Sequence, residues 1–133
     1  MNKFRIKKMN IEDFRLVYGR FCNGHPDYEL FKNEEVDYYL VYLNEEYEDT
    51  FNINITKDNQ LSISYKLFAN NDFIEAFCDN IKTYPYISYS LFSEEQKQYL
   101  NRLLKYVDII KESTEINDNL TYINKIIFKI KNN

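Results

Sequence analysis

The chain has 133 residues, of which 44% are hydrophobic and 29% are charged, and its formal net charge is −4. These values are typical of globular proteins and exclude disorder as the default. No apolar run approaches the ~20 residues of a transmembrane helix. A net negative charge also argues against binding along a nucleic-acid backbone. We therefore expect one cytoplasmic domain over residues 1–133, without membrane or direct nucleic-acid contacts.

Charge is segregated along the chain. Residues 1–20 carry six basic and two acidic side chains, whereas residues 21–50 carry one basic and nine acidic side chains. The last residues are basic again. The chain is thus basic at both ends and acidic in one block.

The first half of the chain predicts strands and one helix. Apolar runs or alternating apolar and polar residues predict strands over residues 3–8, 36–43, 51–55 and 61–67. Asn10 can cap a helix over residues 11–22, whose apolar positions follow the helical period. The polar connection Lys57–Gln60 predicts a hairpin between the last two of these strands.

The second half predicts two helices, each followed by an extended segment. One helix runs from a cap near Asn70 or Asn71 to about Lys82, and residues 84–91 are extended. Ser93 and Gln96 form a capping box for a helix over about residues 94–112. Residues 123–131 alternate as a strand, with a helix from Asn117 as the competing interpretation. The similar basic strands at the two ends of the chain are expected to be neighbours.

Taken together, the elements predict an α+β fold, a mainly antiparallel sheet of about five strands with three helices. Their order resembles that of the GNAT-type N-acetyltransferases, and the opening strand and helix over Phe4–Phe21 are similar to the usual start of that family. The resemblance implies an acyl-CoA pyrophosphate loop, Q/R-x-x-G-x-G/A, after the fourth strand. The chain has Leu67–Asp72 (LFANND) there, with no glycine or basic residue. Because this segment lacks the donors that would hold a pyrophosphate, we expect no cofactor.

The cysteines are expected to be structural. Cys22 and Cys78 fall on the apolar stripes of their predicted helices, where a free cysteine behaves as a small hydrophobic residue. Cys22, His25 and Asp27 have the spacing of metal ligands, but a zinc site needs three or four ligands and no second pair is present. We expect neither a metal site nor a catalytic residue.

Tyrosines and carboxylates interleave in the acidic block. Tyrosine is enriched at protein interfaces because it combines a large contact area with a polar tip. We expect a partner-binding surface here, formed by Glu34, Glu35, Asp37, Tyr39, Tyr42, Glu45, Glu46, Tyr47, Glu48 and Asp49. The acidic residues from Glu45 to Asp49 are expected in a surface turn between two strands. The alternative is that the carboxylates are solvated turn residues and that the rings fill the faces of the sheet.

The functional expectation is a non-catalytic protein-binding module. A small acidic inhibitor, of the phage anti-defence, anti-CRISPR or toxin-immunity kind, would cover the basic surface of a partner protein such as a nucleic-acid-binding enzyme. Two alternatives stay open. One is a diverged GNAT-like acyltransferase that lacks the usual acyl-CoA loop and uses tyrosine and carboxylate groups. The other is a structural subunit of a larger assembly.

Overall fold

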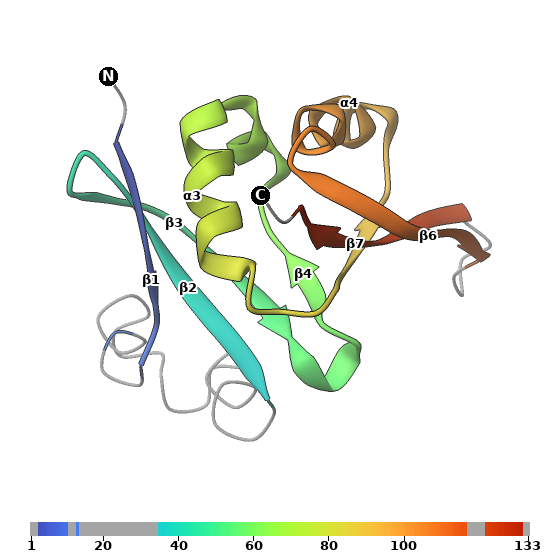
Figure 1. Ribbon diagram of the computed structural model, residues 1–133, viewed down its shortest axis with the longest axis horizontal. Coiled ribbons are helices and arrows are strands. Elements are labelled where there is room, and N and C mark those ends of the chain that lie inside the picture. Colours follow the sequence, from blue (N-terminus) through green and yellow to red (C-terminus); the bar gives the residue numbers. More distant parts are fainter. Residues whose placement is uncertain (1–2, 11–12, 14–34, 117–121, 132–133) are drawn as a thin grey trace.

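The computed structural model describes residues 3–10, 13, 35–116 and 122–131 (Figure 1). Its described strands form one seven-stranded sheet in the order β1-β2-β3-β4-β5-β7-β6. The strands are β1 (Phe4–Lys8), β2 (Val36–Leu43), β3 (Glu46–Asn54), β4 (Gln60–Ser62), β5 (Ile87–Leu91), β6 (Val107–Ile116) and β7 (Tyr122–Ile130). The described α-helices are α3 (Asn71–Ile81) and α4 (Glu94–Leu103). Apart from Asp13, the helix expected over residues 11–22 lies outside the described residues.

The α+β class is confirmed, and the sheet is mainly antiparallel. Only β4 and β5 pair in parallel, and the other neighbouring strands are antiparallel. The expected number of about five strands is wrong, because the sheet has seven. No helix in the described part of the chain is both long and apolar enough to cross a membrane.

Both described helices begin at the caps that the sequence predicts. The Asn70 side chain accepts a hydrogen bond from the backbone of Asp72, and the Ser93 side chain accepts one from the backbone of Gln96. Each helix buries one apolar stripe on the sheet, and α3 contributes Phe73, Ile74, Phe77, Cys78 and Ile81 to the core. The 3-10 helix η3 (Tyr65–Ala69) contacts both helices, of which α3 lies left of the centre and α4 at the upper right of Figure 1.

The helix expected over residues 94–112 is too long. It ends at Leu103, and the chain turns and enters β6 at Val107. The segment from Val107 to Ile110 is rich in β-branched residues, which favour a strand. No glycine or proline marks the end of α4, and β6 is exposed along most of its length, so it lacks the alternation of a half-buried strand.

The surface turn expected around Glu45–Asp49 is shorter than predicted. Only Asn44 and Glu45 form the turn, with φ angles of 52° and 69°, and β3 begins at Glu46. Positive φ at both central residues is the geometry of a two-residue hairpin turn. The strand pairing then continues through the acidic residues, with Val41 opposite Asp49.

The hairpin between β3 and β4 is confirmed, but the expected strand over residues 61–67 ends early. β4 pairs with β3 from Gln60 to Ser62, and residues Tyr65–Ala69 form the 3-10 helix η3. The adjacent Leu67 and Phe68 both turn inward, Leu67 half-buried and Phe68 fully buried. Alternation therefore stops at this point, and tertiary packing overrides the local strand pattern.

The two terminal basic strands are not neighbours. β1 lies at one edge of the sheet beside β2, whereas β7 lies between β5 and β6. This arrangement brings basic residues of β1 onto the acidic block. Arg5 pairs with Glu45 at 3.5 Å, and Lys8 pairs with Asp37 at 3.2 Å. The charge segregation seen along the chain is thus partly neutralised in the fold.

Candidate functional site

The candidate site lies where β4 and β5 separate. The two strands share one registered pair, Gln60 opposite Ser88, after which β4 ends at Ser62 and β5 continues to Leu91. β4 leads through η3 into α3, whereas β5 leads into α4. The start of α3, the helix α4 and the β2–β3 hairpin all lie at this end of the sheet, at the top of Figure 1.

Phe68 of η3 packs against β5 and α3 at this end of the sheet. Its side chain is fully buried and lies against the rings of Phe77 at 5.4 Å and Tyr89 of β5 at 6.3 Å. The edge-to-face arrangement of these rings is favourable beyond the area they bury. Phe68 thus joins η3, α3 and β5 in one aromatic cluster.

Tyr89 places a phenol at the base of this cluster. Its side chain is only 3% exposed, and its hydroxyl makes no hydrogen bond to the described residues. The neighbouring Gln96 is engaged elsewhere, with the carbonyl of Ser90 and the backbone N–H of Phe92. Burial raises the pKa of Tyr89 above its ordinary value, and the nearby Gln96 side chain offsets part of this rise although it lies outside strict hydrogen-bond geometry. A buried hydroxyl without a partner is costly, so this group is a candidate for a functional role.

The start of α3 is joined to α4 by Arg102. Its guanidinium donates a hydrogen bond of 2.9 Å to the carbonyl oxygen of Ala69, one residue before the α3 cap. The fold therefore supplies a basic group beside the glycine-free segment, although that segment itself contains none. The first turn of α3 carries Asp72, whose charge already complements the helix dipole.

A second contact fixes η3 on α4. The Tyr65 hydroxyl donates to a carboxylate oxygen of Glu95 at 3.1 Å, and its ring lies 5.3 Å from that of Tyr99. The hydrogen bond to Glu95 raises the pKa of Tyr65. η3 is thus held from its exposed side by α4 and from its buried side by Phe68.

The predicted acidic surface is divided between two ends of the sheet. Tyr42, Glu45, Glu46, Tyr47, Glu48 and Asp49 lie at the β2–β3 hairpin, at the same end as η3. Glu35, Asp37 and Tyr39 lie toward the opposite end of β2. At about 3.3 Å per residue, Asp37 and Tyr42 are roughly 15–20 Å apart. Glu34 lies outside the described residues.

At the hairpin, Glu46, Tyr47 and Glu48 are exposed, with Tyr47 at 53%. Tyr42 is half-buried, and the Arg5 guanidinium lies 4.3 Å above the centre of its ring. This cation–π contact, together with the ion pair to Glu45, gives Tyr42 a role in holding β1 to the hairpin.

Asp37 and Tyr39 belong to a hydrogen-bond chain at the other end. Tyr84 donates to Asp37, so that Tyr39 must donate to the Tyr84 oxygen, at 2.8 Å. Lys8 neutralises the carboxylate of Asp37 at 3.2 Å. Burial raises the pKa of both tyrosines, which therefore stay protonated. Tyr39 is 5% exposed, and its ring packs in the core.

The cysteine expectation concerns one described residue. Cys78 is a free thiol, 7% exposed on the inner stripe of α3, and burial raises its pKa to about 12. Such a thiol is a poor nucleophile and a poor metal ligand at neutral pH. Cys22, His25 and Asp27 lie outside the described residues. No group of three potential metal-binding side chains occurs in the part of the chain that the structure describes.

No protein-family model and no curated protein sequence matches the chain. Among solved structures, it is similar to the aminoglycoside N-acetyltransferase AAC(6')-Ib11, with a TM-score of 0.60 over 97% of each chain, at 9% sequence identity. A second structure, Escherichia coli ElaA, matches with a TM-score of 0.46 and 11% identity over 97% of this chain and 99% of that one. The first likeness shows that the chain has a GNAT-like fold.

The likeness to AAC(6')-Ib11 overturns the expectation of a non-catalytic inhibitor. That protein is an aminoglycoside N-acetyltransferase, and neither similar structure is an inhibitor, an immunity protein or a phage anti-defence protein. The similar fold favours the alternative that the element order suggested, a diverged GNAT-like acyltransferase, over the inhibitor. Sequence reasoning missed Phe68, Tyr89 and Arg102 at the candidate site, because their juxtaposition arises only when η3, β5 and α4 meet.

Proposed function

We propose that the chain is an acyltransferase that takes its acyl group from a thioester donor of the acyl-CoA class. The observation that carries the proposal is the single parallel pair, Gln60 opposite Ser88, beyond which β4 and β5 diverge in a GNAT-like sheet. Fold likeness alone does not establish chemistry. The proposal therefore also draws on the groups gathered at this end of the sheet.

The phosphates of the donor would be held at the start of α3. Free backbone N–H groups in the first turn of a helix attract anions, and Arg102 adds a guanidinium that forms charge-assisted hydrogen bonds. The exposed Lys66 of η3 lies in the same connection. These two cations would hold the phosphates in place of the missing glycine-rich loop. Asp72 opposes an anion here, so we expect modest affinity.

The thioester would enter between β4 and β5 beside Tyr89, against which the ring of Phe68 lies in the structure. Donor binding thus requires η3 to withdraw this ring. Moving a buried aromatic side chain costs on the order of a few kcal/mol. The free energy of donor binding becomes less favourable by the same amount. The proposal therefore includes a closed state, which is the one described, and an open state.

Tyr89 would serve the leaving group. When an amine nitrogen attacks the thioester carbonyl, a C–N bond forms, the C–S bond breaks, and the amine releases a proton to solvent. The departing thiolate takes a proton from the phenol of Tyr89, which regains one from water. Because burial raises the pKa of Tyr89, the phenol holds its proton at neutral pH and is available as a donor.

An amine acceptor that carries positive charge suits the surroundings. The chain has a net charge of −4, and Glu46 and Glu48 are exposed on the hairpin that projects at the same end. Carboxylates around a site raise the local concentration of cations. The similar structure AAC(6')-Ib11 is an aminoglycoside N-acetyltransferase, and aminoglycosides are polycationic amines.

The test is calorimetric titration with acetyl-CoA, followed by a thiol-release assay with polyamines and aminoglycosides as acceptors. We expect saturable donor binding in the range of about 1 μM to 1 mM, with thiol release that depends on the acceptor. The Phe68→Ala variant is titrated in parallel, because it removes the closing ring. If neither protein binds acetyl-CoA or longer acyl-CoAs up to about 1 mM, the proposal is wrong.

A further inference from the structure

We propose that β6 is the interface of a symmetric dimer, in which the strand pairs antiparallel with β6 of a second copy of this chain. This inference is independent of the proposed acyl transfer. In the described sheet, β6 is the last strand and pairs only with β7. It is 10 residues long, about twice the usual strand length, and the backbone groups of its outer edge pair with no other described strand.

The two edges of the sheet differ in how they are protected. β1, at the opposite edge, has only 5 residues, and three of them are basic, which discourages pairing with another chain. β6 instead carries three exposed isoleucines: Ile109 at 37%, Ile110 at 55% and Ile116 at 57%. Together they make up half of the large hydrophobic side chains exposed among the described residues. An edge of this length and composition is expected to be covered.

The geometry of antiparallel pairing allows few registers. Along an antiparallel pair of strands, hydrogen-bonded and non-hydrogen-bonded residue pairs alternate. A two-fold axis relates each pair to one of the same type, so the axis must pass through a single residue position of β6. An axis at Lys111 would place two lysines opposite each other, and an axis at Glu112 would place two glutamates opposite each other. Like charges in that position are destabilising.

An axis at Ser113 places no like charges opposite each other. Lys111 of one copy then lies opposite Glu115 of the second copy, and the pair occurs twice. Glu112 lies opposite Thr114, and Ile110 comes next to Ile116 at each end of the interface. An axis at Thr114 would instead set Ile116 opposite Glu112. Opposite charges and paired β-branched residues are the favourable cross-strand combinations, so the sequence of β6 selects the axis at Ser113.

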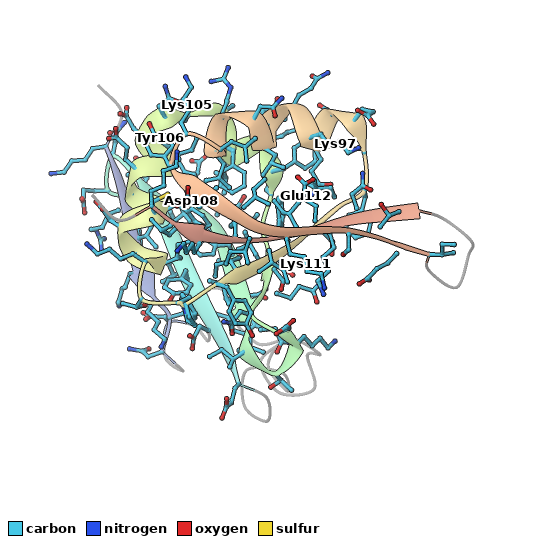
Figure 2. The ribbon with its side chains drawn as sticks, turned by 45° about the vertical axis from the view of Figure 1, so that its right-hand side comes forward. Lys97, Lys105, Tyr106, Asp108, Lys111 and Glu112 are labelled. Atoms are coloured by element: carbon cyan, nitrogen blue, oxygen red, sulfur yellow. The ribbon has the colours of Figure 1, made fainter. Side chains whose placement is uncertain are left out.

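The backbone supports this register. The one irregularity in the β6–β7 ladder falls between Ile109 and Lys111, so that pairing is regular from Lys111 to Ile116. Figure 2 shows Lys111 below the β6 ribbon and Glu112 above it, on the side of α4. The Lys111–Glu115 pairs would therefore lie on the face away from α4, free of its side chains.

Dimerisation would also join two pockets. On the α4 side, Glu112 and Thr114 line a pocket of about 520 Å³, together with Lys97 and Leu100 of α4. A two-fold axis perpendicular to the sheet keeps equivalent faces on the same side. Glu112 and Thr114 of the second copy would thus extend the rim of this pocket across the interface between the two β6 strands.

The test is sedimentation velocity from about 1 μM to about 1 mM, on the full chain. We expect a species of twice the monomer mass of 16.2 kDa to grow with concentration. Lys111→Glu places like charges at both pairs and should give a monomer, as should Glu115→Lys. The double variant Lys111→Glu/Glu115→Lys restores opposite charges and should restore the dimer. Circular dichroism and thermal unfolding confirm that each variant is folded.

Lys105→Glu is the matched control, because it reverses an exposed charge in the turn before β6 and should leave the dimer intact. A wild-type protein that stays monomeric throughout would overturn the proposal. So would a Lys111→Glu variant that dimerises as the wild type does. If both single variants are monomeric but the double variant stays monomeric as well, the pairing at Ser113 is wrong.

Discussion

The Arg102 guanidinium on α4 donates a hydrogen bond to the carbonyl oxygen of Ala69, 33 residues earlier in the chain. This contact fixes a cation beside the first turn of α3 and ties the two helices together at the end of the sheet where β4 and β5 separate. The contact joins α4 to the segment before α3, and the proposed function gives Arg102 a second role in attracting an anionic donor.

Replacing Arg102 separates these roles. Arg102→Ala should weaken acetyl-CoA binding by about ten-fold or more, because charge-assisted hydrogen bonds to phosphate are worth about 1.5–3 kcal/mol. Stability should fall by only about 0.5–1.5 kcal/mol, since the lost hydrogen bond is exposed. Lys97→Ala, on the same helix, is the control and should leave donor affinity unchanged. Equal affinities of Arg102→Ala and wild type in calorimetry would remove Arg102 from the donor site.

The proposed function makes Phe68 the residue that sets the balance between the closed and the open state. Phe68→Ala should lower the free energy of unfolding by about 3–5 kcal/mol, as for other buried phenylalanines. At the same time it should strengthen acetyl-CoA binding, because the donor no longer has to displace the ring. Phe77→Ala, equally buried in α3, should destabilise the protein without a gain in affinity. A loss of affinity in Phe68→Ala would show that η3 does not close the site.

The parts of the fold that were predictable are those in which a local pattern and the tertiary environment agree. α3 has a cap, a full apolar stripe and a sheet beneath it, and its predicted and observed bounds coincide within one residue. β6 has no such agreement. Its side chains are exposed on both faces, so that nothing in the sequence imposes a period of two, and its apolar residues continue the helical spacing of α4.

The candidate site was less predictable than the fold. The acidic block is visible in the sequence, but only the paired strands reveal that Arg5 and Lys8 neutralise part of it. The lack of glycine in Leu67–Asp72 argues against a phosphate site when the segment is considered alone. The structure brings Arg102 to this segment from a helix that no local spacing rule connects with it. Contacts of this range become visible only once the topology is known.

The hairpin turn offers a test of backbone strain. Glu45 has φ 69°, a left-handed conformation that costs a residue with a side chain about 1–2 kcal/mol relative to glycine. Glu45→Gly should relieve this strain, while it loses an exposed ion pair with Arg5 worth about 0–1 kcal/mol. We therefore expect a net gain of about 0.5–1 kcal/mol in chemical denaturation, somewhat offset by the greater flexibility of glycine in the unfolded chain.

Glu45→Ala is the control for this change, because it removes the ion pair and keeps the strain. It should be neutral or slightly destabilising. If Glu45→Gly is less stable than Glu45→Ala, the left-handed conformation of the turn carries no appreciable cost.

Cys78 predicts a specific pH dependence. Burial raises its pKa to about 12 in the folded protein, from an ordinary value of 9.0. The unfolded thiol therefore loses its proton first as the pH rises, and the folded state binds more protons between pH 9 and 12. Stability must then fall with increasing pH across this window. Thermal unfolding from pH 8 to 11 should show the decline, and it should be smaller in Cys78→Ala measured against its own value at pH 8.

The thiol should also resist modification. In a Cys22→Ser background, Ellman's reagent at pH 8 should label Cys78 only after denaturant is added, because the thiolate is scarce and the side chain is buried. Rapid labelling of the folded protein would place Cys78 in an accessible, electropositive environment instead.

Replacing Tyr89 by phenylalanine distinguishes a structural role from a chemical one, because the two roles predict different effects on stability and activity. Its hydroxyl is buried without a hydrogen-bond partner among the described residues, so it contributes nothing favourable to the fold. Tyr89→Phe should therefore raise the free energy of unfolding, by up to about 1–3 kcal/mol, because it removes an unsatisfied polar group and leaves the ring in place. A structural residue replaced in this way would leave activity unchanged or improve it.

As the proton donor to the leaving thiolate, Tyr89 should behave differently. Tyr89→Phe should lower kcat by about 10²-fold or more while KM for the donor stays nearly constant. Because burial raises the pKa of the phenol, this group should keep its proton, and the activity that depends on it, to a higher pH than an exposed tyrosine would. Tyr99→Phe on α4 is the control and should change neither kcat nor stability appreciably. A Tyr89→Phe variant that is more stable and as active as the wild type would leave the proposed acyl transfer without this proton donor.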